Sequence, residues 1–504
     1  MTGELLINLA LLIPIVGAVL IVATGRHPNV REGVTLLTSG ALLVTVLALT
    51  RLVIGGARPE STLVELVPGL DLQLTLEPLG MLFALVAALL WPLNSMYSIG
   101  YMRGNDEGHQ TRFYVCFAVA IASVMGIAFS GNLLTLFVFY EALTISTYPL
   151  VTHHGGEKSM KAGRVYLGIL ISTSIGLLLL AIGWTWVAAG TLDFVPGGIL
   201  AGRVEGPALA LLLALYVFGI GKAAVMPVHR WLPAAMVAPT PVSALLHAVA
   251  VVKAGVFTVV KVVVYIFGLD LLVAETATHW LLYAAGFTVI AASVAALRIG
   301  TQRGNLKRLL AYSTIGQLSY VVLAAAILAP LSAVGAAFHI IAHAFGKITL
   351  FFAAGSIYTA AHKTEINQLD GIGRSMPWTM GAFAVGTLSM IGLPPSGGFV
   401  SKWFMMMGAF QTGQMVAVGI LIVSTLLNAA YFVPIVYIAF FREPAEHGGH
   451  DDHGHHEPAH GEAPLPIVIA TVVTATLSVL LFFFPDVPFT LAEQMLDGVT
   501  GGAP

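Results

Sequence analysis

The chain has 504 residues, of which 57% are hydrophobic and only 10% are charged, and its formal net charge at pH 7 is −2. Soluble domains carry about 25% charged residues, so this composition excludes a soluble protein. The lack of excess positive charge gives no reason to expect nucleic-acid binding. A single cysteine, Cys116, excludes an internal disulfide or a cysteine metal centre.

Apolar stretches of about 20 residues, long enough to cross a bilayer as helices, recur almost end to end. The first begins at the N-terminus, where Glu4 stands in place of the positive charge of a signal peptide, so we expect it to be retained. The pattern predicts an all-α polytopic membrane protein with about fourteen transmembrane helices. The expected spans are 4–24, 32–54, 76–98, 112–130, 132–152, 164–188, 208–229, 241–265, 279–299, 306–328, 332–359, 377–409, 415–440 and 465–484.

The basic residues are distributed unequally between the two sets of loops. Only four fall after even-numbered spans, namely Arg51, Arg58, Arg203 and Lys261. The loops after odd-numbered spans hold Arg26, Arg31, Arg103, Arg112, Lys158, Lys161, Arg164, Arg230, Arg298, Arg303, Lys307, Arg308, Lys363, Arg374 and Arg442. Because basic loops stay in the cytoplasm, we expect a multi-pass protein of the cell (plasma) inner membrane with both termini on the non-cytoplasmic side.

Four lysines fall inside the predicted spans: Lys222, Lys253, Lys347 and Lys402. A lysine at the centre of a membrane helix costs about 2.5–3.5 kcal/mol on insertion scales, so this set indicates a proton or ion path. Glu141 is the one acidic residue placed within a span, and we expect it to pair with Lys222, because each charge offsets part of the other's desolvation. Such a pair could pass protons, or it could only lock two helices together.

Two further patterns place histidines at membrane depth. His339, His343 and Lys347 are spaced four residues apart, so on a helix they share one face over a rise of about 12 Å. Such a column can relay protons, directly or through waters; a metal pair and satisfied polar packing are the alternatives. His247 lies six positions before Lys253, which puts the two about 120° apart on a regular helix.

Prolines interrupt two of the lysine-bearing spans. Pro227 follows Lys222 in span 7, and Pro394 and Pro395 precede Lys402 in span 12. Proline removes a backbone donor, and a broken helix at membrane depth is tolerated where it lines a cavity or is buried in protein. We therefore expect both helices to be broken beside their lysines.

The two broken helices suggest an internal repeat. Spans 4 to 8 and spans 9 to 13 each form a five-helix unit whose fourth helix is broken and carries a lysine. Because each unit has an odd number of helices, the second unit enters the membrane from the side opposite to the first, so the two units are inverted relative to each other. We predict a three-helix segment at 1–110, repeats at 111–265 and 266–441, a His-rich cytoplasmic loop at 442–463, and a last helix and tail at 464–504. The six histidines of the loop could bind Zn²⁺ or Ni²⁺, although a solvated loop is the expected state.

Several stretches carry a family resemblance: FVFYEALTISTYPL, GKAAVMPVHRWLPAAMVAPTPVSALLHAVAVVKAG, NLKRLLAYSTIGQLSY, HIIAHAFGKITLF and GLPPSGGFVSKW. Together they resemble the antiporter-like, proton-translocating subunits of respiratory complex I, membrane-bound hydrogenases and Mrp-type Na⁺/H⁺ antiporters, and the D-type subunit of the Mrp antiporters most of all. Relatives carry acids where this chain has Ala234, Val237 and Asn305, which leaves cation binding at those loops in doubt. The resemblance implies proton-transfer roles for Glu141, Lys222, His247, Lys253, His339, His343, Lys347 and Lys402.

The same resemblance implies a function and partners. The chain would be one component of a multi-subunit Na⁺ (or K⁺)/H⁺ antiporter, working in the lipid bilayer beside other membrane subunits. The alternative is a proton-pumping component of a complex I-like NADH:quinone oxidoreductase or a membrane-bound hydrogenase, as part of a translocase. The sequence holds no Walker, dinucleotide or haem motif, so we expect no bound cofactor and no redox centre in this chain.

Overall fold

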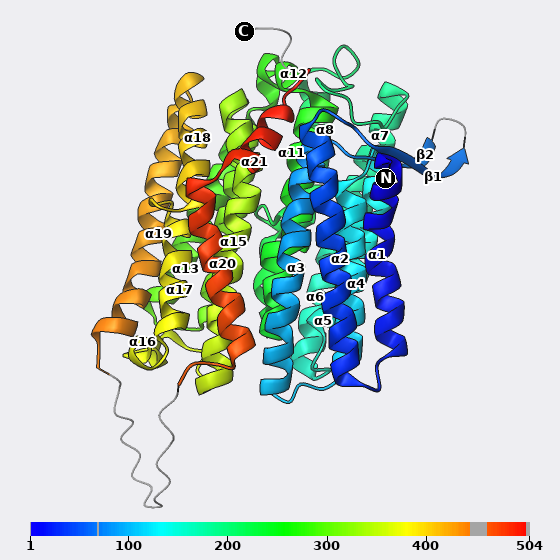
Figure 1. The fold of residues 1–504 in the computed structure, drawn as a ribbon. Helices are drawn as coiled ribbons and strands as arrows, with labels where there is room; N and C mark the ends of the chain where they lie inside the picture. Colours follow the sequence, from blue (N-terminus) through cyan, green and yellow to red (C-terminus); the bar gives the residue numbers. More distant parts are fainter. Residues whose placement is uncertain (1, 68–69, 444–460, 500–504) are drawn as a thin grey trace, which may run out of the picture.

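The computed structural model describes residues 2–67, 70–443 and 461–499. Within these ranges, long helices run side by side between two faces, and twelve of them are long and apolar enough to cross a membrane (Figure 1). We call the end of the bundle that carries both termini the terminal face, and the other end the opposite face. The predicted all-helical, multi-pass class is confirmed.

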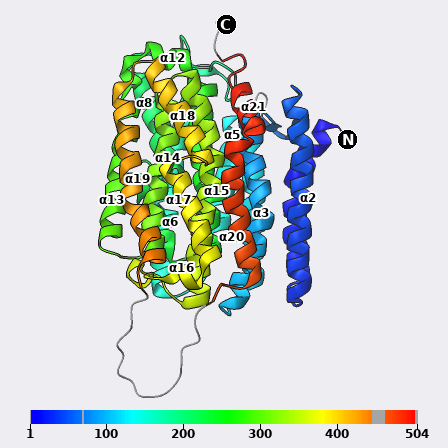
Figure 2. The ribbon, with the colours of Figure 1, turned by 60° about the vertical axis from the view of Figure 1, so that its left-hand side comes forward.

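The N-terminal segment contains three spans and a hairpin. The hairpin was not predicted, although its second strand, LDLQLT, alternates apolar and polar residues with the period of two that a strand requires. Its strands pair antiparallel, with Glu60 opposite Thr75. Figure 2 shows α2 at the edge of the bundle, where it packs beside α3. The bounds are α1 (Gly3–Ala23), α2 (Pro28–Ile54), β1 (Glu60–Val67), β2 (Leu70–Thr75) and α3 (Pro78–Gly104).

Spans 4 to 8 follow the predicted order. Span 6 is continuous through a π-helical turn, and span 8 contains two such turns on either side of its central α-helix. The bounds are α4 (Gln110–Ala128), α5 (Leu133–Val151), α6 (Glu157–Thr173), η1 (Ser174–Leu178), α7 (Leu179–Ala189), α8 (Gly206–Gly219), η2 (Gly221–Ala223), η3 (Val228–Arg230), α9 (Trp231–Ala234), η4 (Ala235–Val237), α10 (Thr240–Ala244), η5 (Leu245–Val249), α11 (Val251–Val262) and η6 (Val263–Phe267).

Spans 9 to 14 complete the bundle, and the His-rich stretch 444–460 lies outside the described residues. The division into two inverted repeats stays a prediction. The bounds are α12 (Leu269–Ala274), η7 (Thr276–Thr278), α13 (Trp280–Thr301), α14 (Leu306–Ala326), α15 (Pro330–Ala361), η8 (Ile366–Gln368), α16 (Ile372–Ser375), α17 (Pro377–Ile391), α18 (Gly397–Gln411), α19 (Met415–Phe441), α20 (Leu465–Phe483) and α21 (Asp486–Gln494).

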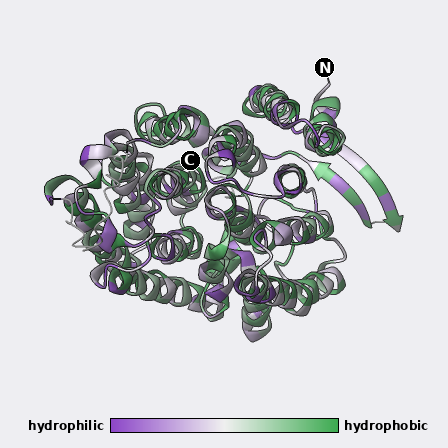
Figure 3. Cartoon of the chain, turned by 90° about the horizontal axis from the view of Figure 1, so that it is seen from below, coloured by the Kyte–Doolittle hydropathy of each residue, from purple (hydrophilic) through white to green (hydrophobic). Residues whose placement is uncertain are grey.

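The centre of the bundle is formed by α15 and by the span from α10 to η6, whose most apolar windows are fully buried. A helix that is apolar all round is suited to such a position. The surrounding helices are also mostly hydrophobic, as Figure 3 shows along the bundle axis. Charged side chains on the two central elements are therefore shielded from lipid by a ring of other helices.

Both predicted helix breaks exist, but the first lies earlier than expected. Helix α8 ends at Gly219, well before Pro227, and Lys222 lies in the short 3₁₀ turn η2. The cause is close packing: a Cβ on Gly255 of α11 would lie 2.3 Å from the Lys222 carbonyl carbon. The second break separates α17 from α18, and Pro394 and Pro395 lie in that gap.

Candidate functional site

Lys222 is held in the break of span 7 by α5. Its Nζ donates to the backbone oxygen of Tyr140 at 2.8 Å and to Oγ1 of Thr144 at 2.6 Å. The same ammonium lies 3.1 Å from the centre of the Tyr140 ring, a cation–π contact. All three side chains are fully buried. The broken backbone thus places a lysine among neutral oxygen acceptors and an aromatic face.

Glu141 does not form the direct ion pair with Lys222 that the sequence predicts. Among the described residues neither of its carboxylate oxygens has a hydrogen-bond partner, although both are shielded from solvent. The physical reason is helix geometry: Tyr140 and Thr144 face Lys222, and the residue next to Tyr140 points about 100° away.

Lys253 and His343 join the two predicted five-helix units. Lys253 Nζ of α11 lies 2.5 Å from His343 Nδ1 of α15, and both side chains are buried. His247, in the π turn before α11, places its Nδ1 3.1 Å from Oγ1 of Thr314 on α14. The π turn changes the angle between the His247 and Lys253 side chains from the 120° of a regular helix. His247 contacts α14 and Lys253 contacts α15, which both belong to the second predicted unit.

His339 and His343 stack with ring centroids 6.0 Å apart, so they share a helix face without a direct hydrogen bond. His339 instead bridges α18 and α14, because its Nδ1 lies 2.7 Å from Ser401 Oγ and its Nε2 lies 3.1 Å from Gln317 Oε1. In the described ranges no group of three or more metal-type ligands lies together. Both ring nitrogens of His339 thus have hydrogen-bond partners, as the polar-packing and relay interpretations require.

Lys347 and Lys402 are linked through uncharged polar groups. Lys347 Nζ donates to Ser313 Oγ at 2.8 Å, and the Tyr431 hydroxyl bonds to the same Ser313 oxygen and to Asn428. Lys402 Nζ donates to two backbone oxygens in the break of span 12, at 3.1 and 2.9 Å; these belong to Met390 and Ile391.

The Met390 oxygen is the point where three branches meet. Besides Lys402, it accepts from Nε2 of Gln317 at 3.0 Å and from Nδ2 of Asn428 at 3.4 Å. A nearly continuous polar chain therefore connects Lys253, the histidine pair, Lys347 and Lys402. Sequence reasoning missed the neutral members Gln317, Ser313, Tyr431 and Asn428; an amide inside an apolar span was the available signal.

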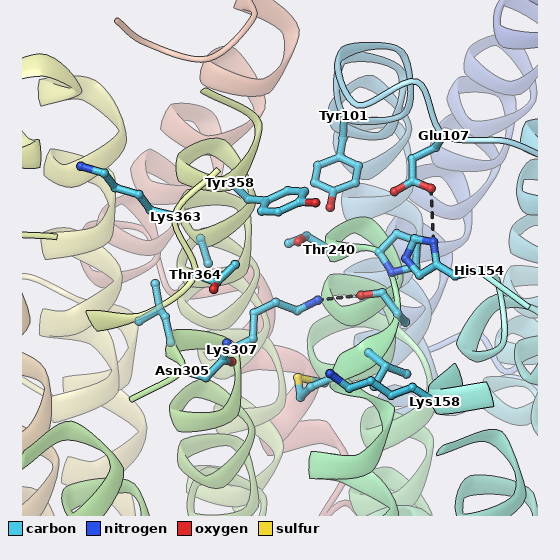
Figure 4. A pocket seen from close by; sticks show the side chains of 16 residues that line it. Tyr101, Glu107, His154, Lys158, Thr240, Asn305, Lys307, Tyr358, Lys363 and Thr364 are labelled. Atoms are coloured by element: carbon cyan, nitrogen blue, oxygen red, sulfur yellow. Dashed lines mark hydrogen bonds and ion pairs between the residues drawn. The ribbon is translucent and has the colours of Figure 1, made fainter. Parts of the chain in front are cut away.

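A cavity of about 340 Å³ opens at the opposite face, below the start of α10 (Figure 4). Glu107 lies there with a carboxylate oxygen 3.5 Å from Nδ1 of His154, and Lys307 Nζ donates to the Ala238 oxygen at 2.6 Å. Burial raises the pKa of Glu107, and the charges of His154 and then Lys307 counteract part of that rise. Thr240 on the cavity wall is seven residues, or about 10 Å of helix rise, from His247.

The fold and this chain of buried titratable groups are those of a polytopic membrane protein that carries ionisable side chains at membrane depth. Residues 130–428 match the family described as NADH:quinone oxidoreductase/Mrp antiporter, TM. The chain belongs to this family of antiporter-like, proton-translocating membrane subunits of Mrp and complex I-like complexes.

Two curated relatives and one solved structure illustrate the range of the family. The chain is 32% identical over 378 residues to NADH-quinone oxidoreductase subunit N of Desulforudis audaxviator, covering 74% of each chain. It is 30% identical over 464 residues to a Na⁺/H⁺ antiporter subunit of Alkalihalophilus pseudofirmus, covering 86% of this chain and 55% of the relative. It superposes with a TM-score of 0.85 and 21% identity on a chain of the Mrp complex from Dietzia sp. DQ12-45-1b, covering 99% and 98% of the two chains.

Proposed function

We propose that this chain is the proton-carrying component of a multi-subunit Na⁺ (or K⁺)/H⁺ antiporter, comparable to the D-type subunit of an Mrp complex. Protons move within the membrane along an axis of eight titratable side chains. These are Glu141, Lys222, His247, Lys253, His339, His343, Lys347 and Lys402.

The observation that carries the proposal is the 2.5 Å contact between Lys253 and His343. Two groups that can each bind or release a proton at this distance can exchange it directly. An ammonium at Lys253 donates to Nδ1, and His343 then holds its own proton on Nε2. The ring becomes an imidazolium, it releases the Nε2 proton to a water molecule that enters beside it, and the return of the remaining proton from Nδ1 to Nε2 resets it.

We further propose that another membrane subunit covers α5. Glu141 lies on the same helical side as Val138 and Ile145, which are 41% and 63% exposed. The two carboxylate oxygens of Glu141 are shielded and have no hydrogen-bond partner among the described residues, and an unpartnered carboxylate at membrane depth is costly. A partner helix with a polar or basic group would cover Glu141 and make its charge responsive to the neighbouring subunit.

The unequal charge of the loops sets the proposed orientation. Most basic residues outside the spans lie at the opposite face, so we place that face in the cytoplasm and the terminal face outside the cell membrane. The cavity beside Glu107 then opens to the cytoplasm. It supplies protons to His247 and Lys253.

A second candidate, a pumping component of a complex I-like oxidoreductase or a hydrogenase, is favoured by one observation. The relative named NADH-quinone oxidoreductase subunit N is 32% identical over 378 residues. In that case partner subunits supply the redox energy, and the same buried axis moves the protons.

Proton flux in vesicles that contain the assembled complex tests the function. Lys222→Ala and Glu141→Ala should each abolish flux and leave assembly intact, whereas the exposed Lys161→Ala serves as a matched control with wild-type flux. Loss of assembly in both variants would instead indicate a purely structural pair. Flux driven by an imposed Na⁺ or K⁺ gradient supports the antiporter; flux that requires quinone reduction or hydrogen evolution supports the second candidate.

A further inference from the structure

A buried ion pair lies outside the axis described above. Lys261, near the end of α11, has no solvent exposure, and its Nζ lies 2.8 Å from Oε1 of Glu77. The ammonium also donates to the backbone oxygen of Ser130 at 2.8 Å and lies 4.3 Å from the centre of the Phe194 ring. In the described part of the chain it is the only lysine within ion-pair distance of a carboxylate. The sequence alone gives no reason to pair these two residues.

Glu77 connects this pair to the aqueous side. It precedes α3 and caps it, because Oε2 accepts from the Leu79 backbone nitrogen at 2.9 Å, and it also accepts from the Tyr265 hydroxyl at 3.3 Å. Its side chain retains 14% exposure and lines a cavity of about 210 Å³ near the hairpin, at the terminal face. One member of the pair is therefore reachable by water, while the other is enclosed.

The enclosed member, Lys261, lies on the same helix as Lys253 of the buried axis. Lys253, Phe257 and Lys261 are spaced four residues apart, so they follow one another along one side of the helix with a rise of about 6 Å per step. The Phe257 ring packs against Phe83 of α3 with centroids 5.0 Å apart. Both rings are fully buried, so an apolar pair separates Lys253 from the Lys261–Glu77 pair.

We propose that Glu77 and Lys261 form an additional proton-transfer site, which exchanges protons between Lys253 and the aqueous cavity at the terminal face. The Phe83–Phe257 pair is the barrier that must move or admit water before exchange occurs. This site deepens the proposed function and rests on it, because it gives the first five-helix unit its own connection to the outer side.

The transfer balances as a simple exchange. The Lys261 ammonium gives a proton to the Glu77 carboxylate, which leaves a neutral amine beside a neutral acid. Glu77 then releases that proton to water in the cavity. The amine is reprotonated from the Lys253 ammonium across the opened barrier, and Lys253 is reloaded from the cytoplasmic cavity beside Glu107. Both charges of the pair are restored at the end.

The first test replaces both charges at once, because a single replacement would strand a buried charge. In the assembled complex, Glu77→Gln with Lys261→Met should lower proton flux at least tenfold while assembly and thermal stability stay near wild type. Glu60→Gln is the matched control: it lines the same cavity, is exposed, and should retain wild-type flux. Wild-type flux in the double variant would overturn the proposal.

The second test addresses water access and the barrier separately. In a Cys116→Ser background, Glu77→Cys combined with Lys261→Met, which again leaves no unpaired buried charge, should react with a membrane-impermeant thiol reagent added from the outer side, and failure to react would overturn the aqueous connection. Phe257→Ala should increase passive proton leak several-fold, whereas vesicles as tight as wild type would refute the barrier. Phe113→Ala, a buried aromatic of α4 beside His153, is the control.

Lys222→Ala distinguishes a failure of the additional site from a failure of the proposed proton-carrying function. Loss of flux in Lys222→Ala with normal flux in the Glu77→Gln, Lys261→Met variant would overturn only the additional site. Normal flux in both would overturn the proton-carrying function itself.

Discussion

Lys253 of α11 and His343 of α15 lie 2.5 Å apart at the junction of the two predicted five-helix units. Both are buried among apolar helices, and each side chain can bind one proton. Each unit contributes one partner to the contact, so a proton that passes from one unit to the other has a direct route here. This relationship leads to the first prediction.

Replacement of either partner should block the transfer. Lys253→Met and His343→Phe should each lower proton flux about 100-fold, in the range of a lost proton-transfer group. The double variant should be no slower than the singles, because both act in one step. Flux is measured in vesicles that contain the complex. Additive losses in the double variant would show that the two residues serve separate routes.

The branch to Lys347 depends on a tyrosine hydroxyl. Tyr431→Phe removes the group that connects Ser313 with Asn428, and we expect about a tenfold loss of flux. Stability should fall by about 1 kcal/mol, the net contribution of a typical hydrogen bond. Tyr437→Phe on the same helix is the control, because that ring is 56% exposed. Equal flux in the two variants would exclude Tyr431 from the path.

A glycine sets the position of Lys222. A Cβ on Gly255 would lie 2.3 Å from the Ala223 nitrogen, so Gly255→Ala must displace the broken backbone of span 7. We expect a loss of stability of about 1–3 kcal/mol, typical of overpacking, together with reduced flux. Gly168→Ala is the control, because the added Cβ meets no atom within 4 Å of the described chain. It should reduce neither the stability nor the proton flux. Thermal unfolding in detergent and vesicle flux measure the two effects.

The opposite face should respond to acid through His153. Burial lowers the pKa of His153 to about 4 from its ordinary value near 6.5. Between these two pH values the unfolded chain binds a proton that the folded chain does not, so stability falls as the pH drops from about 6.5 to about 4.

Thermal unfolding as a function of pH measures this effect. His153→Phe, which keeps an aromatic ring beside Phe113, should lose less stability than wild type over the same interval. The exposed His27→Phe serves as the control and should follow the wild-type curve. Parallel curves for His153→Phe and wild type would refute the assignment of this acid sensitivity to His153.

Much of the architecture could be read from local sequence. The transmembrane helices follow from the length of the apolar stretches. The lysines within these stretches can be recognised as candidate functional residues, because a charge in hydrocarbon is costly. Lys222 and Lys402 do lie in or just after broken segments of spans 7 and 12. The hairpin at 60–75 was missed because its strands are short, only the second alternates apolar and polar residues, and both lie between stronger helical signals.

The partners of those charged residues depended on packing between distant segments. His339 contacts Gln317 and Ser401, and Lys222 contacts Tyr140 and Thr144 in place of Glu141. Hydrophobic periodicity identifies a helix, but in a bundle that is apolar on nearly all sides it does not set the rotation of each helix about its axis. That rotation, fixed by close contacts such as Gly255 against Lys222, determines which polar groups meet.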